Sequence, residues 1–314
     1  MKSKRIIGSA LLFLTAVIWG TAFVAQRVGA EKVEPATLNA TRMLIAAFAT
    51  GVVALVIDLA KRRKAEGEDE SEKKSKRKYT VIGGLLCGLF LTASTNLQQI
   101  GLVYTAAGKA GFITAMYILL VPVLSFLLFR KKSPPLVWCA VAVGMVGMYL
   151  LCIKEGFGFE RGDAFVLGAA LMFSGHIICC DRFVSRGDPV KIASIQFSVV
   201  AVISGAIALI FEEPSWDKIS SAIIPILYCG AISGGVGYTL QLVGQKYTDP
   251  TVASMIMSLE AVFAALSGAL ILGESMSPRE AIGCAVMFLA TVTVQLPPIK
   301  KRKNTNDTPK EENK

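Results

Sequence analysis

The amino-acid sequence predicts an all-α membrane protein with ten transmembrane helices, arranged as two inverted five-helix repeats. Hydrophobic residues make up 53% of the 314 residues, and the mean hydropathy is +0.56, which is more apolar than a soluble domain of this length. Apolar runs recur from end to end, and each is long enough to cross a hydrocarbon core of about 30 Å. The predicted spans are 6–25, 36–59, 79–103, 106–129, 136–153, 163–183, 190–211, 221–243, 251–272 and 279–296.

The first spans carry local features that set their ends and their packing. Residues 1–5 are basic and precede an apolar run, as in a signal peptide, but the run is long, no A-x-A site ends it and nine spans follow. We therefore expect it to stay as a helix. Gly84 and Gly88 in the third span have the small-xxx-small spacing of close helix packing. Pro122 in the fourth span removes a backbone hydrogen bond and predicts a bend.

Charge predicts the orientation of these spans. The chain has 33 Lys and Arg against 23 Asp and Glu, and nine of the basic residues lie in the loop 61–78 between the second and third spans. Alternate loops are rich and poor in Lys and Arg, which is the pattern of the positive-inside rule. We predict a multi-pass protein of the cytoplasmic membrane with both termini cytoplasmic, its basic surface facing anionic lipid and not nucleic acid. The role of the loop 61–78 is left open.

An internal repeat divides the chain. A shift of 143 residues places Gln98 on Gln241 and Pro135 on Pro278 without a gap, and earlier in the chain a shift of 154 places Pro35 on Pro189. The difference corresponds to extra length in the loop 61–78. We predict a first repeat at 1–160, a second at 161–296 and a disordered basic tail at 297–314. Because each repeat has five spans, the two cross the membrane in opposite senses, as in many secondary transporters.

Glu260 is the deepest charge in the predicted spans. A carboxylate at the centre of a bilayer costs roughly 2.5 to 3.5 kcal/mol on insertion scales, so it marks a lined, partly wet pathway. It is a candidate proton acceptor or amine contact. A neutral carboxyl group, hydrogen-bonded to a neighbouring helix, is the structural alternative.

Other polar or aromatic side chains within the spans are candidates for the same pathway. Arg42 could attract an anionic group or brace helices, and His176, the only histidine, could relay protons or pack in neutral form. Buried amides demand hydrogen-bond partners, so those of the third and eighth spans should face the interior. The full set of predicted pathway residues is Trp19, Arg42, Asn96, Gln99, Tyr117, His176, Gln241 and Glu260.

Motifs of catalysis and of cofactor binding are missing from the sequence. There is no Walker A motif, no G-x-S-x-G elbow and no carboxylate pair for an intramembrane aspartic protease. The seven cysteines include no CxxC, and one histidine cannot form a metal site. The sequence predicts no enzyme, no cofactor and no metal.

Several segments resemble the EamA-type ten-helix proteins of the drug/metabolite transporter superfamily. They are Ile18–Val24, Leu38–Arg42, Gly111–Thr114 with Val121-Pro122, and Ser258–Leu266 with Leu272–Glu274. The resemblance covers about residues 6–296, although Ala261 stands where the family pattern has proline. It implies two inverted repeats around a central cavity, with Trp19, Arg42 and Glu260 at matched positions.

The resemblance also implies export or exchange of small metabolites. We expect a secondary transporter that exports an amino acid or a related small metabolite by alternating access, with possible proton coupling. The alternatives are a multidrug or other metabolite exporter, and a non-transporting membrane sensor that retains the fold. The substrate, direction of flux, coupling ion and oligomeric state are left open.

Overall fold

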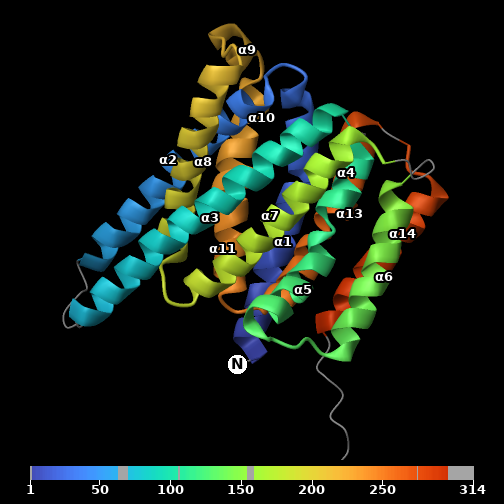
Figure 1. Cartoon of the computed structure of the whole chain (residues 1–314), viewed down its shortest axis with the longest axis horizontal. Coiled ribbons are helices and arrows are strands. Elements are labelled where there is room, and N and C mark those ends of the chain that lie inside the picture. The colour runs from blue at the N-terminus through green and yellow to red at the C-terminus, as the bar shows by residue number, and fades with distance from the viewer. Residues whose placement is uncertain (1, 63–69, 105–106, 154–158, 274, 296–314) are drawn as a thin grey trace, which may run out of the picture.

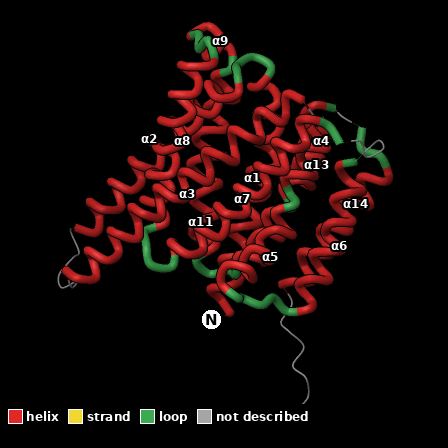
Figure 2. The backbone as a smooth tube through the Cα atoms, in the orientation of Figure 1, coloured by secondary structure: helices red, strands yellow, loops and turns green. Residues whose placement is uncertain are grey.

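The computed structural model describes residues 2–62, 70–104, 107–153, 159–273 and 275–295. Within these ranges all regular structure is helical, as Figure 2 shows. The predicted tail 297–314 and part of the loop 61–78 lie outside the described residues. The helices are α1 (Lys2–Ala30), α2 (Pro35–Arg62), α3 (Glu70–Tyr104), α4 (Ala107–Thr114), α5 (Tyr117–Phe129), α6 (Pro135–Cys152), α7 (Arg161–Val184), α8 (Pro189–Phe211), α9 (Trp216–Ser221), α10 (Ile223–Leu227), η1 (Tyr228–Tyr238), α11 (Thr239–Gln245), α12 (Pro250–Met257), α13 (Glu260–Leu272) and α14 (Pro278–Gln295).

Nine segments of the described chain are long and apolar enough to cross a membrane. They coincide with the first nine predicted spans to within a few residues, apart from the start of α3, which lies well before the predicted residue 79. The tenth predicted span corresponds to α14, which has 18 residues but carries Arg279 and Glu280 in its first turn. The number ten and the inverted repeat stay predictions. The outward surface is strongly apolar, with Leu270 85% and Phe211 79% exposed, as lipid contact requires.

Three of the predicted spans are interrupted. The fourth is divided into α4 and α5, and the ninth into α12 and α13, each at a two-residue junction. The eighth contains the π-helix η1, whose wider turns suit its four glycines. Pro122 lies inside α5, so the break in the fourth span comes before the proline and not at it.

The two junctions are built alike, at positions 143 residues apart. Before α5, the Met116 N–H donates to the Ile113 carbonyl, and before α13, the Leu259 N–H donates to the Ile256 carbonyl. Both are tight i→i−3 bonds. The two half-helices also end alike, because Arg130 after α5 and Gly273 after α13 both adopt the left-handed conformation, at φ 56° and 69°. Arg130 is the only non-glycine residue with positive φ in the described chain.

Helix pairing exchanges partners between the two halves of the chain. The largest contacts join α3 to α7, α2 to α8, α6 to α14, α3 to α8, and α1 to α13. Helix α6 runs beside α14 at one side of the molecule (Figure 1). Glycines allow these close approaches: a Cβ on Gly147 of α6 would come within 2.8–2.9 Å of the α14 backbone. Gly84 and Gly88 of the third span face α8, and Gly230 and Gly234 of the eighth span face α2, so both pairs serve packing within the chain.

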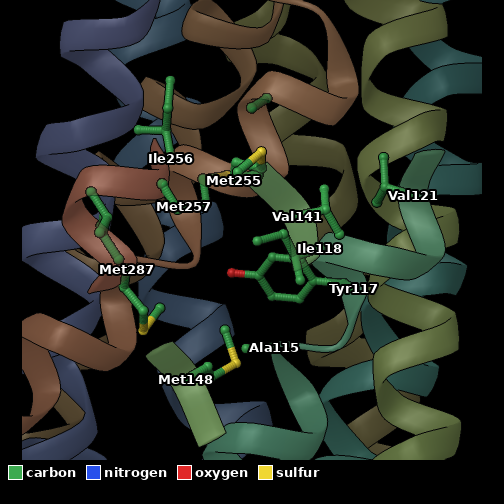
Figure 3. Packing of buried hydrophobic residues seen from close by; sticks show 14 of the residues in the cluster. Ala115, Tyr117, Ile118, Val121, Val141, Met148, Met255, Ile256, Met257 and Met287 are labelled. Atoms are coloured by element: carbon green, nitrogen blue, oxygen red, sulfur yellow. The ribbon is translucent and has the colours of Figure 1, made fainter. Parts of the chain in front are cut away.

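The main core cluster lies where α5, α6, α12 and α14 meet. Figure 3 shows the Tyr117 ring inside this cluster, with Met148, Met255 and Met257 among its members. Tyr117 is only 4% exposed. The junctions of the fourth and ninth spans are therefore buried at the centre of the molecule, next to the site described below.

Candidate functional site

A cavity lies between α1, α2, α3, α7, η1, α11 and the two junctions. Six of the eight predicted pathway residues line it: Trp19, Arg42, Tyr117, His176, Gln241 and Glu260. The structure also places there residues that the predicted set lacks, namely Phe23, Gln26, Met43, Thr95, Gln98, Thr114, Phe173, Ile177, Cys229, Ser233, Gly234, Tyr238 and Met257. The wall thus combines two charged side chains with aromatic rings and amides.

Glu260 and Tyr117 meet at the cavity wall. Each is the first residue of its half-helix, α13 and α5, and each follows the junction that interrupts its span. The Tyr117 hydroxyl donates a hydrogen bond to Glu260 Oε1 at 3.0 Å. Glu260 is 8% exposed. The carboxyl group therefore has one internal partner, while its side chain still faces the cavity.

Arg42 is held in place by neutral oxygen atoms. Its Nη1 donates to Gln26 Oε1 at 2.7 Å, and its Nη2 donates to Asn39 Oδ1 at 2.6 Å. Arg42 Nε is buried without a hydrogen-bond partner among the described residues. No carboxylate forms a salt bridge with this guanidinium in the described chain. Its positive charge is thus positioned but not neutralised, which suits an anionic group in the cavity.

Aromatic residues form the wall between the helices. Trp19 Nε1 donates to the Ser233 carbonyl in η1 at 3.2 Å, and the Trp19 ring lies 4.5 Å from that of Tyr238. A side chain at Gly237 would collide with Trp19 Nε1 at 2.7 Å. The glycines of η1 thus let this indole lie directly against the π-helix. The hydrogen bond to Ser233 and the contact with Tyr238 hold the Trp19 ring in place.

His176 is buried and bonded to a neighbouring helix. It is 1% exposed, and its Nε2 lies 3.1 Å from Gln196 Oε1 in α8. Cys180 Sγ lies 3.5 Å from the same nitrogen, and Cys87 and Cys179 complete a small thiol cluster. No group of three or more His, Cys, Asp or Glu with the geometry to hold a metal ion occurs in the part of the chain that the structure describes.

Asn96 and Gln99 do not line the cavity. Asn96 donates to Ser204 Oγ at 2.8 Å and lies between α3 and α8. Gln99 is 2% exposed, and its Nε2 lies 3.4 Å from Gln26 Oε1, so it reaches Arg42 only through that residue. Gln98, next in the same cluster, lines the cavity instead.

Gln26 was missed because of a boundary. The predicted first span ends at residue 25, whereas α1 continues to Ala30. One further helical turn would have brought this glutamine into the set of intramembrane polar residues. Ser233 had no such signal, because its part in the site is a backbone carbonyl that accepts from Trp19.

A match to a protein-family model identifies the family of this chain. The model described as "EamA-like transporter family" matches the chain twice, at residues 6–153 and 160–296. The chain belongs to the EamA-like transporter family. As a member of this family, it is a multi-pass membrane protein of a transporter family, and the resemblance drawn from the sequence motifs is confirmed.

Similar proteins cover most of this EamA-like chain. An "Uncharacterized transporter" from Archaeoglobus fulgidus is 28% identical and covers 93% of this chain and 87% of its own. The "Uncharacterized inner membrane transporter YedA" from Escherichia coli is 22% identical, with 91% and 89% covered. A "WAT1-related protein" from Arabidopsis thaliana is 26% identical over 73% of this chain and 75% of its own. A solved crystal structure shares the fold, with a TM-score of 0.74 at 20% identity, covering 93% and 96%.

Proposed function

We propose that this EamA-like protein is a secondary transporter that exports an amino acid or a related small metabolite across the cytoplasmic membrane. The observation that carries the proposal is the presence of Arg42 and Glu260 on the wall of one cavity, with Trp19 and Tyr238 beside them. A guanidinium suits a carboxylate, a carboxyl group suits an amine, and aromatic walls suit an apolar side chain. Glu260 is the amine or proton site.

Ten spans in two inverted repeats, 1–160 and 161–296, are part of the proposal. The family model matches the two halves separately, and α14 packs along α6 as a tenth span would. Contacts recur with the halves exchanged: a Cβ on Gly101 would meet Val166 and the Gly162 carbonyl, and a Cβ on Gly244 would meet Leu12 and the Gly8 carbonyl. Each of these second-half residues lies 143 or 154 positions from its first-half equivalent.

Alternating access follows from this arrangement, because inverted repeats can exchange conformations around a midplane site. The two halves meet at Tyr117 and Glu260, which are equivalent positions of the repeats. Following the positive-inside rule, we place both termini in the cytoplasm. The protein is neither an enzyme nor a nucleic-acid binder in this proposal, since its cavity lies within the helices and its basic loops follow the membrane orientation.

Release from proteoliposomes tests the proposal. Vesicles with the purified protein are loaded with a mixture of the twenty common L-amino acids labelled with ¹³C, and release is followed by mass spectrometry with and without an imposed pH gradient. We expect the wild type to release a subset of the mixture. Glu260→Gln should abolish the part of the release that depends on the pH gradient. The glutamine amide, unlike the carboxyl group, cannot bind and release a proton in the cavity.

Glu213→Gln is the matched control, since Glu213 is exposed and lies outside the apolar spans. Unchanged release from Glu260→Gln vesicles would remove Glu260 from the mechanism. Release of cationic dyes in place of amino acids would favour a multidrug exporter. Binding of a labelled amino acid without any release would favour a non-transporting sensor.

A further inference from the structure

Three buried polar atoms along α11 and the turn after it have no hydrogen-bond partner among the described residues. They are Gln241 Oε1, Gln245 Oε1 and Thr248 Oγ1, and the exposed fractions of these residues are 1%, 2% and 5%. Gln241 and Gln245 are four residues apart and share one face of α11, and Thr248 follows in the turn after the helix. We call Gln241, Gln245 and Thr248 the α11 polar line. It begins at the cavity, which Gln241 lines, and ends beside the start of α12.

The parts of α1 and α7 that pack against the α11 polar line offer almost no hydrogen-bond donors to it. Thr248 Oγ1 lies against Gly8 of α1, and a Cβ atom added to Gly8 would be 2.5 Å from this oxygen. Gly244 lies against Leu12 and the Gly8 carbonyl. On the α7 side, Gln245 Nε2 donates to the Ile177 carbonyl at 3.0 Å. That bond fixes the orientation of the amide, because exchanging its oxygen and nitrogen would set two acceptors against each other. The Gln245 oxygen therefore stays without a donor.

The equivalent helix of the first half does not share this feature. Gln98 lies 143 residues before Gln241, and its Nε2 donates to Thr114 Oγ1 at 3.1 Å. The position equivalent to Thr114 is Met257, which has no hydroxyl group. The position equivalent to Gln245 is Leu102, which needs no partner. Gln241 Oε1 accepts no hydrogen bond from any residue in the described ranges, although Gln241 is almost fully buried.

We propose that the α11 polar line is the closed half of the translocation pathway, leading from the cavity to the end of the molecule that holds the N-terminus (Figure 1). Buried polar groups without partners cost free energy in the state shown, and a second state that hydrates them would account for their presence. In that state the N-terminal part of α1 moves away from Gly244. Water and the polar groups of the substrate then bond to the three side chains. This inference rests on the proposed function.

The far end of the line is closed by an ion pair between the two halves. Lys131, just after α5, lies 2.7 Å from Asp249, the residue that follows Thr248 and caps α12. Both partners are partly exposed, with side-chain exposures of 50% and 39%. Such a pair is weak enough to open and close repeatedly. It lies where a gate at the end of this pathway would be needed.

Substitutions that remove the unpartnered atoms test the proposal. Gln241→Met and Thr248→Val keep the volume and delete the polar group. We expect unchanged or raised thermal stability of the empty protein, because no internal hydrogen bond is lost. Release of the labelled amino-acid mixture should fall about tenfold, the factor that one hydrogen bond contributes at the crossing step.

Gln98→Met is the matched control at the equivalent position. It breaks the bond to Thr114, so it should lower the melting temperature, unlike Gln241→Met. Wild-type release rates in Gln241→Met and Thr248→Val would overturn the proposal. A fall in stability of Gln241→Met as large as that of Gln98→Met would also overturn it, because it would reveal an internal partner.

Thiol labelling provides an arm that needs no substrate. Thr248→Cys, in membranes treated with a membrane-impermeant maleimide, is compared with Leu242→Cys, which is fully buried on another face of α11. Mass spectrometry of the peptide distinguishes the new thiols from the native cysteines. Labelling at 248 and not at 242 supports the pathway, and equal absence of labelling overturns it. If the wild type releases none of the amino acids, the proposed function fails, while this comparison still decides whether the line opens to water.

Discussion

At the scale of single residues, a hydrogen bond at the centre of the molecule joins two residues that start corresponding half-helices. Tyr117 and Glu260 lie 143 residues apart, start the half-helices α5 and α13, and share a hydrogen bond of 3.0 Å. Two junctions of the same backbone geometry thus carry different side chains at the point where they meet. In the proposed function, Glu260 is the proton-exchanging group and Tyr117 orients it through this hydrogen bond.

A double-mutant cycle measures this pair. Tyr117→Phe and Glu260→Ala should each lower the stability of the detergent-solubilised protein, and the double variant should lose less than their sum, with a coupling of roughly 0.5–3 kcal/mol. Thermal and denaturant unfolding of the four proteins provide the numbers. Effects that add within about 0.5 kcal/mol would mean that the hydroxyl and the carboxyl do not stabilise one another.

At the scale of helices, small residues determine which elements can touch. Gly101 of α3 packs against α7, and Gly244 of α11 packs against α1, with contacts of the same kind. Hydropathy alone cannot select these partners, because every span presents a similar apolar surface. The close approach of backbones selects them, since helices in a membrane associate by packing and not by exclusion from water.

Alanine at these glycines tests the packing. A Cβ on Gly244 would stand 2.8 Å from Leu12 Cγ and 3.0 Å from the Gly8 carbonyl oxygen, so Gly244→Ala should lower the melting temperature despite the better helix propensity of alanine. Gly111→Ala in α4 is the control, because no atom lies within 4 Å of its Cβ position. It should leave stability unchanged or raised. A Gly244→Ala protein as stable as the Gly111→Ala protein would show that α1 and α11 do not pack so closely.

At the scale of the whole molecule, polar contacts join the two halves at both ends. At one end Glu34 pairs with Lys218, and Glu212 at the end of α8 accepts bonds from Ala36 and Thr37 at the start of α2. At the other end Lys191 lies 2.7 Å from Asp58, and Lys131 from Asp249. In the proposed alternating-access cycle, opening either end requires some of these contacts to separate.

The Glu34–Lys218 pair predicts a dependence of stability on pH. The Lys218 ammonium donates a hydrogen bond to Glu34 and holds the pKa of that carboxyl group below its usual value of 4.5. A carboxyl group with a lowered pKa in the folded state stabilises that state at pH values above its usual pKa. This stabilisation is lost as the pH falls through the lowered pKa. Glu34→Gln should therefore lower the melting temperature slightly at pH 7, and the difference should vanish in acid.

Glu31→Gln, in the same connection, serves as the control for the loss of one negative charge, since Glu31 is exposed. Melting curves of the wild type and both variants between pH 3 and pH 7 provide the comparison. A difference between wild type and Glu34→Gln that persists unchanged at the lowest pH would mean that ionisation of Glu34 does not contribute to the pair's effect.

The sequence alone determined the all-helical membrane class and the first nine spans, and six of its eight predicted pathway residues line the cavity. Hydropathy is a local property, and a charge at bilayer depth costs much free energy. Glu260 and Arg42 could therefore be recognised as charges within the spans, and as pathway candidates, without any knowledge of their neighbours. The amides were harder to assign, because Gln98 and Gln99 are adjacent and only the rotation of α3 decides which of them reaches the cavity.

The tertiary structure decided the rest. The breaks before Tyr117 and Glu260, the π-helix η1 and the unpartnered Gln241 depend on which helices lie side by side. Ala261 removes the proline signal of the family pattern, yet the ninth span still breaks at Ser258 and Leu259. Whether a buried polar group is satisfied is a property of a pair of residues far apart in the chain. Hence the sequence by itself could name such groups but not their partners, since only packing brings the partners within bonding distance.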